Sequence, residues 1–390
     1  MQDSAQLNLP FFESKHEVLS KNLHLWAKTH LNDVDCPDVD AHCRQLVGQL
    51  GRDDWLKYCV AGQENGGLFS QIDNRSICLI REILAKHSGL ADFAFAMQGL
   101  GSGAISIAGS KEQKERYLPK VSKGQSIAAF ALSEPHAGSD VAALSCEATL
   151  SGDHYILNGE KTWISNGGIA DFYVVFARTG DAPGSRGISA FIVDKHSDGF
   201  EIAERIHVIA PHPLARIKFT NCAVPVSNRI GSSGEGFKIA MRTLDIFRTS
   251  VASAALGFAK RAFHEALERA KTRKMFNGHL VDFQITQVKL AEMATRIESA
   301  ELLTYKAAWL KDQGKNVTKE AAMAKMTATE NAQWVIDAAV QMFGALGVVS
   351  GVIVERLYRE IRALRIYEGA TEVQMLIIAK SVLENHRVNS

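Results

Sequence analysis

A single glutamate near the end of the sequence has the surroundings of a general base. Glu368 lies within the segment Arg365–Gln374, between the aromatic Tyr367 and Gly369, with apolar residues close by. Partial burial disfavours the charged form of a carboxylate, which raises its pKa and suits the group to take up a proton during catalysis. The segment therefore predicts a general base at Glu368, with a surface glutamate at a helix end as the alternative.

Two other segments, around Ser133 and around Trp163, carry groups that suit a flat and partly polar ligand. The backbone amides around Ala137–Ser139 are predicted to form a concave anion site. Trp163 is predicted to shield a flat aromatic cofactor, with the hydroxyl groups of Ser133 and Ser165 at its polar edge. The alternative is a pair of ordinary turns and a core tryptophan.

Several common chemistries are absent from the sequence. It holds no Gly-x-x-x-x-Gly-Lys-Ser/Thr loop, no His-Glu-x-x-His pair and no Gly-x-Ser-x-Gly elbow. The glycine-rich Gly99–Gly103 does not fit the dinucleotide fingerprint and is predicted to serve helix packing or a turn. The cysteines are scattered, so we expect no metal site and free buried thiols at Cys36, Cys43, Cys59, Cys78, Cys146 and Cys222.

Composition narrows the class of protein. The 390 residues carry 44 Lys and Arg against 43 Asp and Glu, a formal net charge of +1, and 46% of them are hydrophobic. Because nucleic-acid-binding proteins usually show a basic excess, no nucleic-acid partner is expected. The N-terminus lacks the features of a signal or transit peptide, and no apolar run approaches the ~20 residues that cross a bilayer. We therefore expect a cytoplasmic protein that does not enter a membrane.

The distribution of proline divides the chain. Six of the eight prolines lie between Pro119 and Pro225, and none follows. The proline-free remainder is rich in helix-forming residues, and its apolar residues recur every three or four positions, as from Leu256 to Ala270. This pattern predicts a C-terminal helical bundle over residues 232–390.

Residues 127–231 show the patterns of β-strands. Phe172–Ala177 and Ile188–Val193 are β-rich, and Asn158-Gly159 indicates a hairpin turn between two short runs. Strands at this spacing, with no helical pattern between them, predict an antiparallel β-barrel or sandwich.

The first 126 residues return to a helical pattern, as in Ser76–Leu84. A doubly wound α/β sheet is disfavoured, because strands do not alternate with helices. The order along the chain therefore predicts a multi-domain α+β fold: an N-terminal helical domain (1–126), a middle β domain (127–231) and a C-terminal helical bundle (232–390).

The whole pattern resembles the acyl-CoA dehydrogenase flavoprotein family over essentially the full chain. Leu132–Asp140 matches the first signature of that family, and Trp163–Gly168 follows at the expected distance. Arg273–Phe276, with Gln284 beyond it, looks like the family's Arg-x-x-Phe…Gln segment, and Ile366–Gly369 matches its catalytic segment. The predicted order of domains is also that of the family.

This resemblance implies FAD-dependent α,β-dehydrogenation of an acyl-CoA thioester to the trans-2-enoyl-CoA, in fatty acid or carboxylic acid catabolism. Glu368 would take the α proton while the β hydrogen leaves as hydride to the flavin. The Glu368 backbone N–H and a ribityl hydroxyl of the cofactor would stabilise the enolate oxygen. The resemblance further implies a homo-oligomer, most often a tetramer, and an electron-transfer flavoprotein as electron acceptor.

The same resemblance assigns residues to the cofactor and the substrate. The flavin ring would be lined by Phe130, Leu132, Ser133, Trp163 and Ser165. The adenosine diphosphate portion of FAD would be held by Arg273, Phe276, Gln284, Gln341, Gly344 and Thr371, the arginine supplying a fixed positive charge for the pyrophosphate. The acyl-CoA would contact Ser139, Phe247, Arg248, Tyr367 and Gly369.

Some positions depart from the family pattern. Ala345 stands where Gly or Ser is expected, and Gly351 stands where an acidic or amide residue is expected. The segment Ile209–Ala215 carries two prolines where many members have a turn with glycine, and its His212 is predicted to be structural.

Two positions bear on the substrate. Phe247 occupies the place at which a minority of the family carries the base, which supports Glu368 in that role. We expect the Phe247 ring to disfavour long straight acyl chains. No arginine lies in Ser88–Asp92, where members that act on glutaryl-CoA carry one, so a substrate with a terminal carboxylate is less expected.

Two alternatives remain open. A flavin enzyme of the same fold can instead be an acyl-CoA oxidase or a desulfinase, although members that lose dehydrogenation often lack the glutamate that Glu368 matches. A non-catalytic flavin-binding or nucleic-acid-associated member would show a basic C-terminal surface, which the balanced charge supports little.

Overall fold

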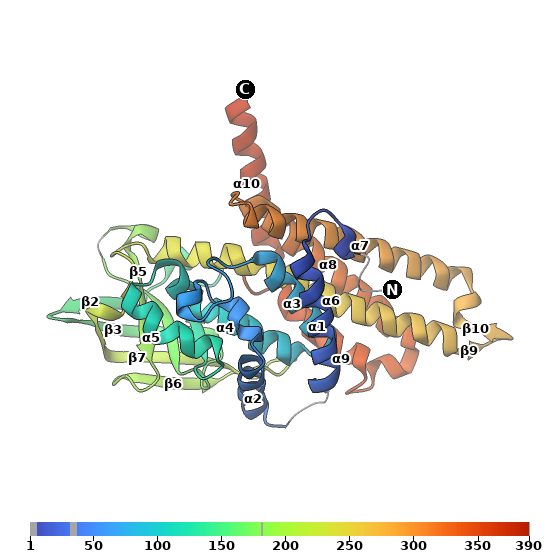
Figure 1. Ribbon diagram of the computed structural model, residues 1–390, viewed down its shortest axis with the longest axis horizontal. Helices are drawn as coiled ribbons and strands as arrows, with labels where there is room; N and C mark the ends of the chain where they lie inside the picture. Colours follow the sequence, from blue (N-terminus) through green and yellow to red (C-terminus); the bar gives the residue numbers. More distant parts are fainter. Residues whose placement is uncertain (1–5, 32–36, 181, 390) are drawn as a thin grey trace. The chain divides into compact units, whose positions relative to one another are not determined.

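The computed structural model describes residues 6–31, 37–180 and 182–389 (Figure 1). The chain divides into two compact units: the first is Met1–Asp35, Asn74–Asp92 and Arg248–Ser390, and the second is Cys36–Asp73 and Phe93–Phe247. Helices α4 (Gly89–Ala108) and α6 (Gly236–Thr272) have residues in both units. Each unit has its own hydrophobic core.

The first unit is helical. Its elements are most of α6 together with α1 (Ser14–His30), α3 (Asn74–His87), β9 (Lys274–Met275), β10 (Gly278–His279), α7 (Gln284–Asp312), α8 (Thr318–Phe343), α9 (Ile353–Leu364) and α10 (Thr371–Asn389). The core is rich in alanine, with Ala255, Ala262 and Ala266 of α6 buried in one cluster with Met293 and Ile297 of α7. These are the long helices that the proline-free sequence predicts.

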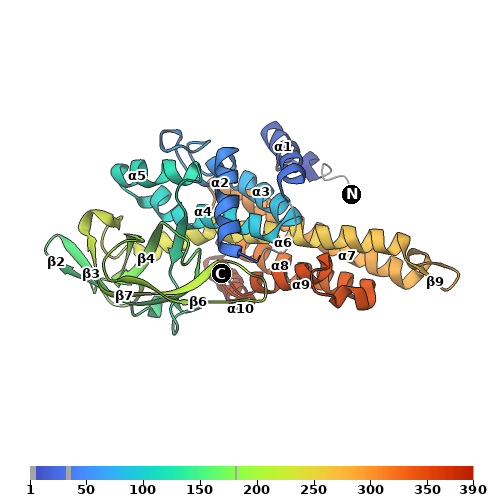
Figure 2. The same ribbon diagram turned by 90° about the horizontal axis from the view of Figure 1, so that it is seen from below.

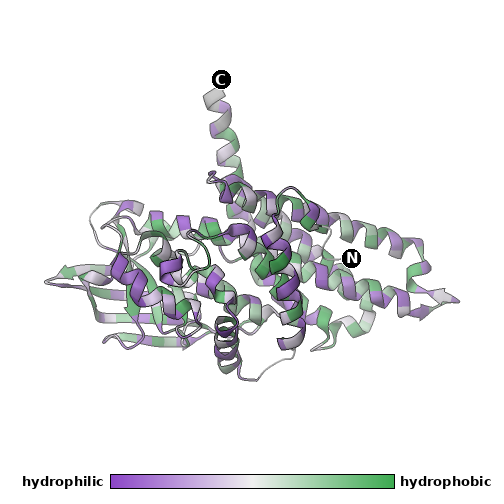
Figure 3. Ribbon diagram, viewed as in Figure 1, coloured by the Kyte–Doolittle hydropathy of each residue, from purple (hydrophilic) through white to green (hydrophobic). Residues whose placement is uncertain are grey.

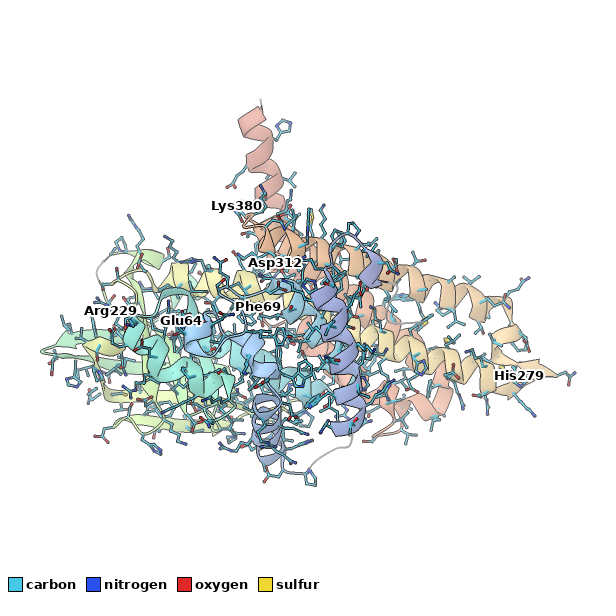
Figure 4. All side chains as sticks on the ribbon, viewed as in Figure 1. Glu64, Phe69, Arg229, His279, Asp312 and Lys380 are labelled. Carbon is cyan, nitrogen blue, oxygen red and sulfur yellow. The ribbon has the colours of Figure 1, made fainter. Side chains whose placement is uncertain are left out.

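The start of α3 is fixed by a carboxylate from α7. Asp312 (labelled in Figure 4) accepts hydrogen bonds from the backbone N–H groups of Asn74, at 2.7 Å, and Arg75, at 3.2 Å. These N–H groups have no partner within their own helix, so Asp312 acts as a cap supplied from outside. The Arg75 guanidinium also donates to Asp312 at 2.7 Å. This pair therefore ties α3 to α7.

The second unit is built on a β-sheet. Its strands are β1 (Ala128–Ala131), β2 (Glu147–Ser151), β3 (His154–Ser165), β4 (Phe172–Arg178), β5 (Ile188–Asp194), β6 (Phe200–Arg205), β7 (Leu214–Pro225) and β8 (Arg229–Ile230). Besides most of α4, its helices are α2 (Val39–Arg52) and α5 (Lys111–Ser122). Figure 2 shows α5 over one face of the sheet, and buried side chains of α5 pack with Phe172, Val174 and Phe176 of β4.

The strands follow the order β6-β7-β3-β2-β4-β5-β8, and β1 pairs with β4. Most pairs are antiparallel, but β1 and β2 each meet β4 in parallel. The path does not close on itself, so the predicted sandwich fits and the barrel does not. The α+β fold is confirmed: along the chain, a helical region precedes the β region and another follows it. The boundaries 1–126, 127–231 and 232–390 stay a prediction.

The hairpin turn predicted at Asn158-Gly159 is wrong. Strand β3 runs straight through these residues, and the turn falls between β2 and β3, where Gly152 has a φ of +61°. At Gly159, with a φ of +138°, the pairing of β3 with β7 shifts register, and a Cβ there would lie 2.8 Å from Cys146. The glycine therefore serves a β-bulge and a close approach of strands, which the dipeptide alone does not distinguish from a turn.

The glycines Gly99 and Gly103 lie inside α4, which confirms the prediction of helix packing. A Cβ at Gly99 would lie 2.5 Å from the Phe247 ring, and one at Gly103 would lie 2.9 Å from Thr243. The N-terminal part of α6 therefore packs closely on α4 because these positions carry no side chain.

Several smaller predictions also find their place. Cys43, Cys59, Cys78, Cys146 and Cys222 are buried free thiols as predicted, whereas Cys36 lies outside the described residues. Within the described part of the chain, no helix is both long and apolar enough to span a bilayer. Short 3-10 helices occur at Gln6–Asn8, Trp55–Cys59, Gln63–Asn65, Val141–Ala143, Gly184–Gly187, Val226–Asn228, Leu280–Asp282 and Gly344–Val348, the last named η8.

Candidate active site

Glu368 lies in the turn that joins α9 to α10 in the first unit. Its backbone φ is +52°, in the left-handed region that few residues other than glycine adopt. The carboxylate oxygen Oε2 is buried and has no hydrogen-bond partner among the described residues. Burying an unpaired carboxylate oxygen costs stability, so this group is a candidate for function and not for structure. The alternative of a surface glutamate at a helix end is therefore wrong.

Three side chains from different helices hold the carbonyl groups of this turn. Arg248 of α6 donates from Nε to the carbonyl oxygen of Glu368 at 3.4 Å. Lys325 of α8 donates from Nζ to the carbonyl oxygen of Gly369 at 2.7 Å. Gln374 of α10 donates from Nε2 to both carbonyl oxygens, at 3.3 and 2.8 Å. The turn is thus tied to three helices, which fixes the backbone of Glu368.

Glycine is required at the position after the glutamate. Gly369 has a φ of +93°, and a Cβ there would lie 2.4 Å from Nε2 of Gln374. With both carbonyl groups held, the backbone N–H of Glu368 has no acceptor among the described residues. One residue therefore presents a carboxylate and an unpaired amide donor, the two groups that proton abstraction next to a carbonyl uses.

Buried charges surround the Glu368 carboxylate. Burial raises the pKa of Glu368, and the positive charges of Arg81, Arg248 and Lys325 oppose that rise. Burial also lowers the pKa of Lys325 to about 8, although the nearby Glu368 favours its charged form. The charge of each group therefore opposes the shift that burial causes in the pKa of the other.

The second unit carries a separate cluster of candidate residues. Trp163 in β3 is 60% exposed and has a φ of +59°, where the pairing of β3 with β7 shifts register between Lys161 and Ile164. A bulge of this kind turns a side chain out of its regular direction. The hydroxyl groups of Ser133 and Ser165 form no hydrogen bond within the described part of the chain. The alternative of a core tryptophan is therefore wrong.

A buried ion pair joins the two segments of this cluster. The ammonium group of Lys161 donates to a carboxylate oxygen of Glu134 at 2.7 Å and to the carbonyl oxygen of Leu132 at 3.1 Å, and both charged side chains are buried. The backbone N–H of Thr162 donates to the carbonyl oxygen of Ser133 at 3.0 Å. Glu134 also accepts from two backbone N–H groups, at 2.6 and 2.9 Å. These contacts hold the Ser133 and Trp163 segments side by side.

Comparison with known proteins shows the family to which the chain belongs. Sequence models of the acyl-CoA dehydrogenase N-terminal, middle and C-terminal domains match residues 13–125, 129–222 and 234–383. The chain belongs to the acyl-CoA dehydrogenase family. It is an FAD-dependent oxidoreductase that acts on acyl-CoA, as the resemblance implies.

Individual relatives include enzymes named for opposite directions of reaction. The short-chain specific acyl-CoA dehydrogenase of Clostridium acetobutylicum is 44% identical over 289 residues, 74% of this chain and 76% of that protein. Subunit CarC of the caffeyl-CoA reductase-Etf complex of Acetobacterium woodii is 41% identical over 315 residues, 80% of this chain and 83% of that protein. The structure of butyryl-CoA dehydrogenase from Megasphaera elsdenii has a TM-score of 0.88 at 34% identity and covers 95% of this chain and 99% of that one.

The cluster in the second unit fits the flavin of an acyl-CoA dehydrogenase. An exposed indole, together with two hydroxyl groups that have no partner among the described residues, suits a flat ring with polar edges. Phe130 and Leu132 contribute less side-chain surface, since Leu132 is buried and Phe130 packs on Phe176 with ring centroids 4.9 Å apart.

The predicted anion site around Ala137–Ser139 needs a correction. The backbone N–H of Ala137 donates to the carbonyl oxygen of Glu134 at 3.1 Å, so this amide is not available to an anion. Ser139 is exposed, and a Cβ at Gly138 would meet nothing within 4 Å. Only the outer part of the predicted site is open.

Five of the six residues predicted for the adenosine diphosphate portion lie at one end of the first unit. They are exposed around the β9–β10 hairpin, marked by His279 in Figure 4, and at the end of α8: Arg273, Phe276, Gln284, Gln341 and Gly344. Arg269 of α6 stacks on Phe343 of α8 at 5.6 Å, which shows that the two helix ends meet. Phe276 is 79% exposed and has a φ of +44°, so its ring is presented outward.

Thr371 does not lie with that group. It begins α10, and its hydroxyl donates to Glu330 of α8 at 2.6 Å. Glu330 also pairs with Arg365 at 2.8 Å. At 1.5 Å per residue along α8, Glu330 and Gly344 are roughly 20 Å apart. The residues predicted to hold one part of FAD therefore form two separate sets.

The predicted substrate residues have varied surroundings. Phe247 is buried against Gly99 and Gly103 of α4, and Arg248 holds the backbone of the Glu368 turn. Tyr367 packs on the core of the first unit. Outside these predictions, His212 stacks on Phe93 with ring centroids 4.6 Å apart, in keeping with a structural histidine.

Sequence reasoning missed the residues that support both clusters. These are Arg81, Asp92, Lys325 and Gln374 around Glu368, and the Glu134–Lys161 pair beside Trp163. The available signal was a charged residue inside an apolar pattern, as at Arg81 within Ile77–Leu84. Such a residue is buried only with a partner, but the sequence does not show where the partner lies.

Proposed function

We propose that this acyl-CoA dehydrogenase oxidises an acyl-CoA thioester to the trans-2-enoyl-CoA, with Glu368 as the base that removes the α proton. The observation that carries the proposal is the buried Oε2 atom of Glu368, which has no hydrogen-bond partner in the part of the chain that the structure describes. Because burial raises its pKa, this carboxylate accepts a proton more readily than an exposed one. The hydrogen bonds from Arg248, Lys325 and Gln374 to the backbone of the turn keep Glu368 in place for that step.

The backbone N–H of Glu368 stabilises the enolate oxygen in this proposal. Removing the α proton places negative charge on the thioester oxygen, and a fixed unpaired N–H lowers the energy of that charge. Since the carbonyl groups of the turn bind side chains of three helices, the donor is positioned before the substrate arrives.

FAD, when bound, supplies the acceptor for the β hydrogen and its electron pair. Trp163, Ser133 and Ser165 hold the flavin ring, and Arg273 supplies positive charge to the pyrophosphate. The aromatic ring of Phe276 and the amide groups of Gln284 and Gln341 complete the set near Arg273. Their exposure within one chain supports this assignment.

The substrate is proposed to carry a short acyl chain. Phe247 is fully buried and occupies the space that Gly99 and Gly103 leave on α4. A relative that is 44% identical is named as short-chain specific. Both observations favour a short chain over a long straight one.

Reduction of an enoyl-CoA is the second candidate function. A relative that is 41% identical is named as a subunit of a caffeyl-CoA reductase complex. The same carboxylate, once protonated, returns the proton to the α carbon in that direction, so Glu368 serves both reactions. The favoured direction then depends on the electron partner, not on the base.

The proposed partners are an electron-transfer flavoprotein and further copies of this chain. The first is supported by the relative that works in an Etf complex. A homotetramer is supported by the two separate sets of FAD residues, since one cofactor then touches two chains. It is also supported by exposed apolar side chains on α7, η8 and α10, namely Ile285, Val288, Val348, Leu376 and Leu383. Figure 3, which colours the ribbon by hydropathy, shows apolar positions among the polar ones on these helices. We also propose a cytoplasmic location and a role in carboxylic acid catabolism, supported by the buried free thiols.

An anaerobic titration tests the proposed function. Purified protein with bound FAD is mixed with a panel of straight, branched and cyclic acyl-CoAs, and the loss of flavin absorbance is followed. Bleaching by an acyl-CoA, with slow recovery in air, is the expected result. Rapid reoxidation by oxygen would instead indicate an oxidase, and bleaching by no acyl-CoA would overturn the proposal.

A further inference from the structure

A buried ion pair lies in the first unit close to the Glu368 turn. Arg81 of α3 donates from Nε and Nη2 to the two carboxylate oxygens of Asp92 in α4, at 2.8 and 2.9 Å. The side chains are 2% and 5% exposed. The remaining Nη1 atom donates to the hydroxyl of Ser250 in α6 at 2.9 Å. This two-bond arrangement fixes the guanidinium group.

The pair is linked to the Glu368 turn through α6 and interacts electrostatically with the candidate base. Ser250 lies two residues after Arg248 in α6. The side chain of Arg248 donates to the carbonyl oxygen of Glu368 at 3.4 Å. Arg81 also interacts electrostatically with both Tyr367 and Glu368. Its guanidinium group therefore belongs to the charged surroundings of the carboxylate.

A buried ion pair is weak evidence for stability, because removing two charges from water costs about as much as their attraction returns. Apolar residues of similar size would serve packing equally well at these positions. The two charges act on a third buried charge with opposite signs: Arg81 favours ionised Glu368, and Asp92 disfavours it. The ion pair thus exerts two opposing electrostatic effects on the pKa of Glu368, which apolar residues at these positions would not.

We propose that Arg81 and Asp92 are positioning residues whose paired charges set how readily Glu368 accepts a proton. The inference rests on the proposed function, in which Glu368 is the base. Asp92 partly neutralises Arg81, so the carboxylate stays basic enough to take the α proton. Arg81 in turn keeps burial from leaving Glu368 protonated at working pH.

Other groups also face Glu368 and stay unchanged in the test. They are Arg248 from α6, Lys325 from α8, the neutral amide of Gln374 from α10, and Tyr367 on the turn itself. Because Arg81 and Asp92 carry opposite charges, substitutions that neutralise one or the other should act in opposite directions.

The test is the pH dependence of anaerobic flavin reduction in the holoenzyme. Asp92→Asn leaves the Arg81 charge uncompensated, so the acidic limb of the profile should move to lower pH by about one unit. Arg81→Gln leaves the Asp92 charge, so the limb should move to higher pH by a similar amount. Arg81→Lys keeps the charge and should restore a limb close to that of the wild type.

A matched control comes from the same helix. Arg75 of α3 pairs with the buried Asp312 of α7 at 2.7 Å, whereas the main charges that act on Glu368 are those of Arg81, Arg248, Lys325 and Asp92. Asp312→Asn therefore removes a buried carboxylate from an arginine of α3 and leaves these main charges in place. Its thermal stability should fall, while its acidic limb stays in place.

A second measurement reads Glu368 without turnover. The infrared carbonyl band of protonated Glu368, identified by its loss in Glu368→Gln, should titrate in the holoenzyme with the same opposite shifts in Asp92→Asn and Arg81→Gln. Shifts of the same sign, or unmoved titrations in folded variants, would overturn the inference.

Failure of the proposed function is separate: Glu368→Gln would then retain flavin reduction, whatever the effect of substitutions in the Arg81–Asp92 pair. If Asp92→Asn and Arg81→Gln fail to fold, Ser250→Ala, which removes one hydrogen bond of the Arg81 guanidinium group, must shift the band while Arg81→Lys leaves it near the wild-type position, or the inference fails.

Discussion

The carbonyl oxygen of Gly369 accepts a hydrogen bond of 2.7 Å from the ammonium group of the buried Lys325. The two residues lie on different elements, and the contact places a positive charge beside the turn that carries Glu368. Lys325 therefore has two effects: it holds the backbone of the turn, and its charge influences the ionisation of Glu368.

Lys325→Met is expected to impair the base in two ways. The turn loses an anchored carbonyl group, so the rate of flavin reduction should fall about tenfold or more. Glu368 also loses a positive neighbour, which raises its pKa, so the acidic limb of the pH–rate profile should move to higher pH. Lys380→Met on the exposed part of α10, labelled in Figure 4, is the control and should change neither quantity. A variant limb that stays in place would contradict the role given to Lys325.

Glu134→Gln is expected to destabilise the second unit strongly. The buried Lys161 would lose its charged partner, and breaking one side of a buried pair costs about 3–5 kcal/mol in the free energy of unfolding. Denaturant unfolding measures this, with Glu147→Gln at an exposed position of β2 as the control. A loss below about 1 kcal/mol would show that the pair is not needed to hold the Ser133 and Trp163 segments.

The same pair predicts a dependence of stability on pH. Although burial opposes it, the Lys161 charge holds the pKa of Glu134 below its ordinary value of 4.5. The folded state therefore binds fewer protons than the unfolded state in this range, and stability falls as the pH drops below about 4.5 and through the lower folded value. Glu134→Gln should lack this part of the acid sensitivity.

Trp163→Ala is expected to weaken FAD binding with little effect on the fold. The side chain is 60% exposed, so its loss should change the stability of the cofactor-free protein by no more than about 0.5 kcal/mol. The affinity for FAD, measured by titration of the cofactor-free protein, should fall about tenfold or more, since an aromatic cover is lost. Leu150→Ala, at another exposed apolar position of this unit, should leave the affinity unchanged. Equal FAD affinities in the wild type, Trp163→Ala and Leu150→Ala would show that Trp163 does not contact the flavin.

Phe247→Ala is expected to extend the accepted acyl length. The buried ring occupies the space beside Gly99 and Gly103, and its removal opens that space. Rates of flavin reduction are compared for straight acyl-CoAs of increasing length in the wild type and the variant. Phe258→Ala, at a buried position of the same helix, controls for a general loosening of the protein. A chain-length profile like that of the wild type would exclude Phe247 from the acyl site.

The sequence predicts the long helices and the strands well, because their signals are local. Proline-free periodicity around Leu256 predicts α6, and the β-rich run at Phe172 predicts β4. The Asn158-Gly159 hairpin is wrong for the opposite reason: a left-handed glycine suits both a turn and a bulge, and pairing with a distant strand decides between them.

The candidate site divides in the same way. The motifs identify Glu368 and Trp163, but their exposure depends on residues far along the chain. The Glu368 carboxylate interacts with charges from α3, α6 and α8, and no local pattern links Arg81 or Lys325 to it. The unusual backbone at Trp163 likewise arises from its register against β7. Tertiary contacts of this kind lie outside what residue spacing encodes.

The most direct test concerns proton removal by Glu368. In Glu368→Gln the side chain keeps its size but cannot accept the proton, so FAD should stay bound while the anaerobic rate of flavin reduction by acyl-CoA falls at least about 100-fold. Glu372→Gln, at an exposed position on α10, should reduce its flavin at the wild-type rate. A Glu368→Gln protein that holds FAD and still bleaches within about threefold of the wild-type rate would show that another group takes the proton.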